Sequence, residues 1–157
     1  EIDSLRIALE CGYAGTSHKN CKGVFKSVAN ACLLAYYQKQ DPGRKLILSG
    51  EDLANIGPVA LLQDLTVMSL LGIEHVERNG HHYFPGLSMF PEPLQQQTLS
   101  AHSDLYHQFA GFPTLHIVDG RVDINSLLTS PFGYQQNISL NHWFQPEISW
   151  NFESLQI

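Results

Sequence analysis

The sequence lacks long apolar runs and clusters of basic residues. Its longest apolar runs, 59–62 and 69–73, fall far short of the roughly 20 residues that are needed to cross a bilayer. Its nine Lys and Arg residues are scattered, no basic run alternates with aromatic residues, and the formal net charge is −6. These absences argue against a nucleic acid or a membrane as a partner. No basic segment followed by an apolar one opens the chain, so we expect a soluble, cytoplasmic protein that binds a small molecule.

The sequence also lacks the usual cysteine and histidine patterns of cross-linked or zinc-bound domains. Cys11, Cys21 and Cys32 are odd in number, and none belongs to a Cys-x-x-Cys motif. We therefore expect reduced thiols rather than a disulfide framework. His81 and His82 are adjacent, so on a strand they would point apart, and a structural zinc site is disfavoured.

What is present is an alternation of expected strands and helices. The chain has 157 residues, of which 43% are hydrophobic, which suits one globular domain with a sizeable core. Short apolar runs predict strands over residues 13–18, 45–49 and 73–77, and helical spacing predicts helices over 24–38 and 59–71. This order predicts βα units with parallel strands and right-handed crossovers.

The pattern changes after the third expected strand. Residues 79–93 mix Pro and Gly with aromatic side chains, which predicts an ordered loop. We expect a helix within 94–109, and a hairpin in which Asp119-Gly120 forms the turn between 114–118 and 121–124. We accordingly divide the chain into βα units over 1–93 and a helix, hairpin and irregular tail over 94–157.

Three parallel strands make a poor closed core, because each would be buried on both faces only if further strands flanked it. The fold class that we predict is therefore α/β, as a partial (β/α)8 TIM barrel that comprises about the last three βα units. The pattern of residues 1–12 is that of the end of a helix, with Gly12 as its C-cap, so we expect further chain before Glu1.

Polar residues stand where each expected strand gives way to its helix or loop. Lys19 and Lys22 follow the first strand, Glu51 and Asp52 follow the second, and Glu77 ends the third. Barrel enzymes carry their catalytic groups at this edge of the sheet. These residues are therefore the candidates for chemistry.

The order of these features resembles the C-terminal part of the enolase superfamily, in its mandelate racemase and muconate lactonizing branch. Lys19-Asn-Cys-Lys22-Gly23 resembles the end of the sixth barrel strand, with Lys19 at the reactive position. Gly50-Glu-Asp52 resembles the end of the seventh strand, and Val76-Glu77-Arg78 that of the eighth. The turn Asp119-Gly120 followed by Pro131-Phe-Gly133 is similar to the closing segment, so the resemblance covers roughly residues 1–135.

This resemblance implies a Mg-dependent enzyme that removes the proton alpha to a carboxylate. Such a proton is hard to remove, and divalent charge at the developing oxyanion supplies much of the stabilisation. Lys19 is then the base or acid, Glu51 or Asp52 binds polar groups of the substrate or relays a proton, and a protonated Glu77 donates to the enediolate oxygen. A lysine acts as a base when nearby positive charge or desolvation lowers its pKa.

Three further residues complete the set that the resemblance suggests for substrate binding beside Asp52: His18, Lys22 and His81. His18 adjoins Lys19, so on a strand it should face away from it. His81 would lie at the mouth of the pocket.

The sequence also departs from the family. In the family, the magnesium ligands come from the third, fourth and fifth strands, which this chain does not contain, so we expect them upstream. We also expect a homo-oligomer, or association with the missing barrel half. A His paired with an Asp is absent from the seventh and eighth positions, which disfavours two-base racemisation and leaves open a dehydratase, epimerase or cycloisomerase of a hydroxy or sugar acid.

Each candidate residue also has a structural interpretation. Lys19 and Lys22 could form a solvated pair, the Glu51-Asp52 carboxylates could cap the following helix, and Glu77-Arg78 could be a surface ion pair. His81 could belong to an aromatic loop packed on the rim. The whole chain could be a truncated, non-catalytic relative that serves as a small binding domain, or a zinc-binding regulatory module that uses its His and Cys residues.

Overall fold

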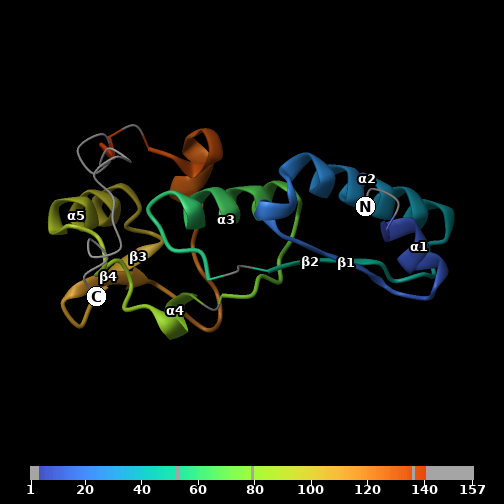
Figure 1. Ribbon diagram of the computed structural model, residues 1–157, viewed down its shortest axis with the longest axis horizontal. Helices are drawn as coiled ribbons and strands as arrows, with labels where there is room; N and C mark the ends of the chain where they lie inside the picture. Colours follow the sequence, from blue (N-terminus) through green and yellow to red (C-terminus); the bar gives the residue numbers. More distant parts are fainter. Residues whose placement is uncertain (1–3, 52–53, 79, 136, 141–157) are drawn as a thin grey trace, which may run out of the picture.

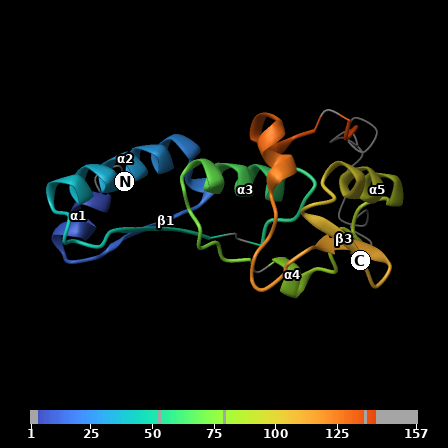
Figure 2. The same ribbon diagram turned by 180° about the vertical axis from the view of Figure 1, so that it is seen from behind.

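The computed structural model describes residues 4–51, 54–78, 80–135 and 137–140. The molecule is elongated, with residues 4–50 at one end and residues 92–115 at the other (Figure 1). Helix α3 (Ala60–Leu70) lies between the two ends, and the view from behind shows the same arrangement (Figure 2). No helix of the described residues is long and apolar enough to cross a membrane.

The first two βα units form as the sequence predicts. Strands β1 (Gly15–His18) and β2 (Ile47–Gly50) are parallel, and their register runs from Gly15 opposite Ile47 to His18 opposite Gly50. Helix α2 (Val24–Gln40) joins them and is two residues longer than the expected 24–38. The chain thus has the α/β character that the alternating pattern indicates.

The third expected strand is reduced to a single parallel bridge between Gly50 and Val76. Two backbone hydrogen bonds hold it, from Gly50 N–H to the His75 carbonyl at 3.1 Å and from Glu77 N–H to the Gly50 carbonyl at 3.0 Å. The segment lies beside β2, so the three segments follow one another in chain order. Within the described residues these segments do not close a barrel.

Two apolar clusters stabilise the fold. The larger one surrounds α3 (Ala60–Leu70), which places Leu62 and Leu65 against Leu105, Tyr106 and other buried side chains of the C-terminal part. The smaller one joins α1 (Ser4–Glu10) to α2 through Leu5, Leu9 and Leu34.

The C-terminal part differs from the prediction in the position of its hairpin. The paired strands are β3 (Tyr106–Phe109) and β4 (Phe112–Leu115), which are antiparallel and join at Ala110-Gly111. Residues 112–115 take this nearer partner, so the predicted pairing of 114–118 with 121–124 shrinks to one bridge between Val118 and Arg121. The Asp119-Gly120 turn does form, with φ of 50° and 73°, the left-handed values of a type I′ turn.

Shorter helices complete the described structure. Helix α5 (Glu92–Ala101) corresponds to the helix that we expect within 94–109, although it begins earlier and ends before β3. The remaining elements are η1 (Asn20–Lys22), α4 (Gly80–Tyr83), α5 (Glu92–Ala101), η2 (Asn125–Thr129) and η3 (Pro131–Gly133).

Candidate functional site

Lys19 and Glu51 form an ion pair at the ends of the two parallel strands. Lys19 follows β1, Glu51 follows β2, and Lys19 Nζ lies 2.5 Å from Glu51 Oε2. The Ser17 hydroxyl donates to the other carboxylate oxygen of Glu51. The carboxyl ends of parallel strands meet at one edge of the sheet, so residues that are 32 positions apart come together there.

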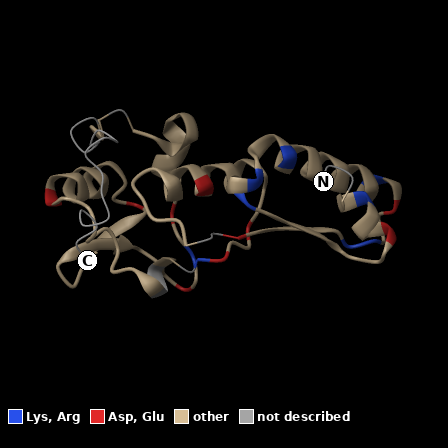
Figure 3. Ribbon diagram, in the orientation of Figure 1, with Lys and Arg blue, Asp and Glu red and all other residues tan. Residues whose placement is uncertain are grey.

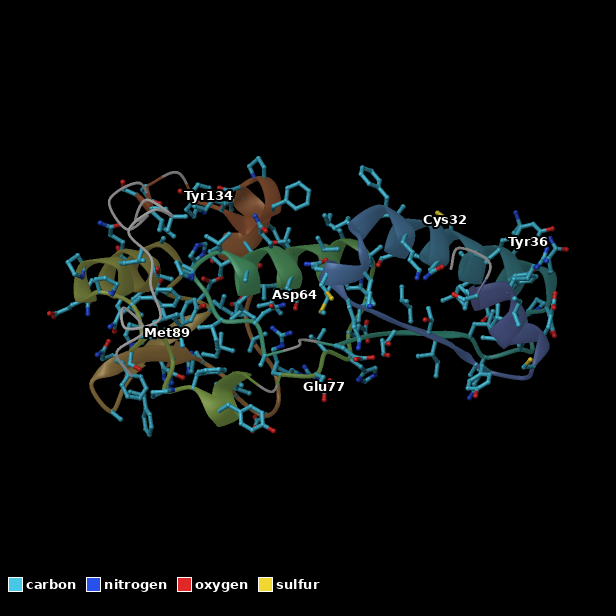
Figure 4. All side chains as sticks on the ribbon, viewed as in Figure 1. Cys32, Tyr36, Asp64, Glu77, Met89 and Tyr134 are labelled. Carbon is cyan, nitrogen blue, oxygen red and sulfur yellow. The ribbon has the colours of Figure 1, made fainter. Side chains whose placement is uncertain are left out.

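Glu77 lies at the same edge. It follows the Gly50–Val76 bridge, it is exposed, and its charge contributes to the field at Lys19. Glu51 and Glu77 line one open depression together with Ser49, His75 and Gly120. Acidic and basic residues gather where β1 and β2 end (Figure 3), and Glu77 projects from the chain at that place (Figure 4). The structure therefore brings together all three residues that the sequence suggests as catalytic.

The ion pair keeps both of its members charged. The hydrogen bond to Glu51 raises the pKa of Lys19 above its usual value, and the carboxylate charges of Glu51 and Glu77 act in the same direction. The hydrogen bonds from Lys19 and then from Ser17 lower the pKa of Glu51. Lys19 is thus held as an ammonium ion, which can donate a proton but cannot accept one. To act as the base suggested in the sequence analysis, Lys19 would need a lowered pKa, and the pair with Glu51 raises it.

His18 lies away from this edge. It is buried, its Nδ1 atom is 2.5 Å from the hydroxyl of Ser27 on α2, and its neighbour Lys19 points to Glu51. Burial lowers the pKa of His18 and outweighs the opposing effects of Asn20 and Asp64, so the imidazole is neutral at pH 7. In this structure His18 ties β1 to α2 and is not on the surface that a substrate at the rim would contact.

The other proposed substrate-binding residues do not join the cluster. Lys22 is exposed in η1, and its side chain projects into solvent. Asp52 and the side chain of His81 lie outside the residues that the structure describes.

Sequence reasoning missed a buried ion pair behind the rim. Arg78 Nη2 lies 2.8 Å from Asp64 Oδ2, and the side chains of Arg78 and Asp64 are only 9% and 0% exposed. Arg78 also donates from Nε to the carbonyl of Glu77 at 2.8 Å, which fixes the segment that carries Glu77. Burial raises the pKa of Asp64, while the guanidinium of Arg78 opposes that rise. The sequence feature that could have indicated this pair is Asp64 itself, the single acidic residue of the mostly apolar helix α3. Asp64 faces the segment that carries Glu77 (Figure 4).

The described residues do not form a metal site. Among them, no group of three or more His, Cys, Asp or Glu side chains could hold a metal ion. Glu74 lines the same depression as Glu51 and Glu77, and Glu51 already accepts from Lys19 and Ser17. The three cysteines are free and exposed. These residues therefore do not supply the ligand set for magnesium that the resemblance implies.

Comparisons with known proteins add no relative, since no family model, no curated protein and no solved structure matches the chain. What the rim offers chemically is an ammonium ion, the Glu51 carboxylate that orients it and the exposed acidic side chains of Glu74 and Glu77. This arrangement suits proton transfer to or from a small polar molecule.

Proposed function

We propose that this chain is the C-terminal part of a Mg-dependent enzyme that abstracts the proton alpha to the carboxylate of a hydroxy or sugar acid. The observation that carries the proposal is the meeting of Lys19, Glu51 and Glu77 at the ends of three segments that follow one another in chain order. Convergence at this edge is the usual position of catalytic groups in α/β barrels. The proposal includes a partial barrel of the enolase type and the reactions of a dehydratase, epimerase or cycloisomerase.

The roles of the three residues follow from their charge states. Lys19 carries the proton in both directions: as a neutral amine it takes the alpha proton from the substrate, and the ammonium ion so formed gives a proton to a departing hydroxyl group or back to the carbon of the enediolate. Glu51 and Ser17 orient the ammonium group, and the exposed Glu77 is placed to contact an oxygen of the substrate. A substrate that draws Glu51 away would lower the pKa of Lys19 and allow it to act as a base.

Magnesium would supply positive charge beside the developing enediolate. Because the described residues do not make up its ligand set, we place the ligands in the part of the protein that the resemblance assigns to the upstream strands. The roles of Lys19, Glu51 and Glu77 do not depend on direct contact with the ion.

The outer surface of the first βα unit supports the idea of a partial barrel. Phe25, Val28, Cys32 and Tyr36 recur at helical spacing on α2 and are all exposed, with Phe25 at 91%. Cys32 lies on the side of α2 away from the strands (Figure 4). Within the described residues β1 pairs only with β2, so its other edge is open. A preceding strand and helix, from the rest of the barrel or from a second copy, would cover both surfaces.

The proposal is tested by following solvent deuterium into the alpha carbon of gluconate and tartrate in the complete protein. Lys19→Ala should abolish the exchange, because it removes the group that takes the alpha proton and returns a deuteron from solvent. Lys22→Ala is the matched control, since it removes an exposed ammonium group three positions away, and it should leave most of the activity. Exchange that persists in Lys19→Ala at the wild-type rate would remove Lys19 from the mechanism.

A second candidate is a non-catalytic binding domain. The raised pKa of Lys19 favours it, because that shift comes from the ion pair with Glu51. Such an ion pair could equally be a structural contact between the ends of the two strands. The two functions differ in what the isolated chain should do. A self-contained domain is a stable monomer, whereas part of a barrel exposes an unpaired strand edge and associates through it.

A further inference from the structure

A small cavity lies behind the rim, between the loop after β2, the segment after Glu77 and the hairpin. Its walls are mostly apolar and include Ile56, Leu61, Leu87 and Leu115. The space open to a water-sized group is about 20 Å³, which is enough for one such group. Apolar walls with few polar groups are typical of sites for small molecules.

The hydroxyl group of Tyr106 is the polar atom that distinguishes this cavity. Tyr106 lines the cavity and is 2% exposed, and its hydroxyl oxygen has no hydrogen-bond partner among the described residues. Burial raises the pKa of Tyr106, so the phenol keeps its proton and is a donor at all ordinary pH values. Gly57 packs closely on this hydroxyl, because a Cβ atom at that position would collide with it.

The charges around the cavity favour an uncharged ligand group. Arg78 also lines the cavity, but Asp64 neutralises its guanidinium at 2.8 Å. An anion placed there would lose its hydration without gaining a net positive charge. An uncharged oxygen would instead accept from Tyr106 and leave the ion pair intact.

Some residues that line the cavity lie close in sequence to residues of the rim. Asn55, which lines it, comes four residues after Glu51, and Arg78 directly follows Glu77. Residues of the rim and residues of the cavity wall are thus close neighbours along the chain.

We propose that this cavity is a specificity site that receives a hydroxyl oxygen at the far end of the substrate, with Tyr106 as the hydrogen-bond donor. This inference rests on the proposed function and narrows its substrates to acids with hydroxyl groups along the chain. An acid with an apolar end of the same length leaves the buried Tyr106 hydroxyl without a partner and binds less well.

The test is a titration followed by the backbone amide signals of Leu87 and Leu115 in nuclear magnetic resonance spectra. Gluconate is the probe, and hexanoate, which has six carbons and a carboxylate but no hydroxyl groups, is its comparison. Gluconate should shift both signals in the wild-type protein, and hexanoate should bind about tenfold more weakly. Equal binding of the two acids, or no shift at these residues, would overturn the proposal.

Two variants locate the effect at the hydroxyl. Tyr106→Phe keeps the ring and should weaken gluconate about tenfold while it leaves hexanoate unchanged. Tyr134→Phe is the control, because the Tyr134 hydroxyl donates to the Ile138 carbonyl at 2.6 Å and does not line the cavity. Gly57→Ala displaces the Tyr106 hydroxyl by contact and should weaken gluconate even if Tyr106→Phe does not fold. Unchanged gluconate affinity in a folded Tyr106→Phe or Gly57→Ala protein contradicts the site.

This result is separable from the proposed function. The Leu87 and Leu115 signals report on the cavity, which Lys19 does not line, whereas deuterium exchange reports on the rim. Binding at the cavity without any deuterium exchange in the wild-type protein would refute the enzyme proposal and keep the site. Exchange with gluconate that does not respond to Tyr106→Phe would refute the site and keep the enzyme proposal.

Discussion

At the scale of single residues, the molecule places its charges with a clear division of roles. Lys19 and Glu51 form a half-exposed pair that solvent can reach, whereas Asp64 and Arg78 form a buried pair. An exposed pair contributes little to stability because water screens it, but it sets the protonation state of its members. In the function that we propose, the first pair takes part in proton transfer, whereas the second pair joins α3 to the segment of Glu77.

Replacing Glu51 should change the ionisation of Lys19. In Glu51→Gln, the pKa of Lys19 should fall toward its usual value, because the hydrogen bond and the negative charge that raise it are lost. The measurement is a pH titration of the Lys19 Nζ signal by nuclear magnetic resonance. The control is Glu10→Gln, which removes a carboxylate from α1 in an exposed pair with Arg6. An unchanged Lys19 pKa in Glu51→Gln would show that the pair does not persist in solution.

The same pair predicts the direction of a pH dependence. The pKa of Lys19 is raised on folding, so its contribution to stability is full below its unfolded pKa and is lost as the pH rises through the folded value. The pKa of Glu51 is lowered on folding, so its contribution is present above its unfolded pKa and is lost as the pH falls through the folded value. In urea unfolding at several pH values, both losses should appear as a small difference in the free energy of unfolding between the wild-type protein and Glu51→Gln.

At the scale of elements, the buried pair joins α3 to the segment that carries Glu77. Asp64→Ala leaves the Arg78 guanidinium buried without this carboxylate, so we expect the free energy of unfolding to fall by about 3 to 5 kcal/mol. Glu10→Ala breaks the exposed Arg6–Glu10 pair and should cost less than about 0.5 kcal/mol. Chemical denaturation measures both. A loss in Asp64→Ala as small as that in Glu10→Ala would mean that the pair does not hold these elements together.

The elements themselves were largely predictable where local patterns decide them. Helical spacing predicted 24–38 for α2, which spans Val24–Gln40, and an apolar run predicted 45–49 for β2, which spans Ile47–Gly50. The hairpin lies earlier in the chain than predicted, because residues 112–115 pair with residues 106–109. The sequence of neither segment specifies which strand it will pair with.

The candidate site was predictable to the same degree. Parallel strands bring their carboxyl ends together, so the meeting of Lys19, Glu51 and Glu77 follows from the order of elements. The burial of Asp64 and the unpaired hydroxyl of Tyr106 could not be predicted, because they depend on how α3 packs against the hairpin.

At the scale of the whole molecule, the exposed surface of α2 lies on the same βα unit as the edge of β1 that no described strand covers. The isolated chain should therefore self-associate at high concentration, as measured by analytical ultracentrifugation. Phe25→Asp places a charge on this surface and should shift the chain toward monomers. Leu70→Asp, at a 74% exposed position on α3, is the control and should have no such effect. A wild-type chain that is monomeric at all concentrations would favour the self-contained binding domain.

We propose that the rim carries out proton transfer at the carbon next to a carboxylate. The most direct measurement is the loss of the alpha-proton signal of gluconate or tartrate when the complete protein is incubated with it in heavy water and magnesium. The signal should disappear at a rate that a chelator lowers, and Lys19→Ala should abolish its loss. An alpha-proton signal that persists in full with every hydroxy and sugar acid tested would refute proton transfer at the rim.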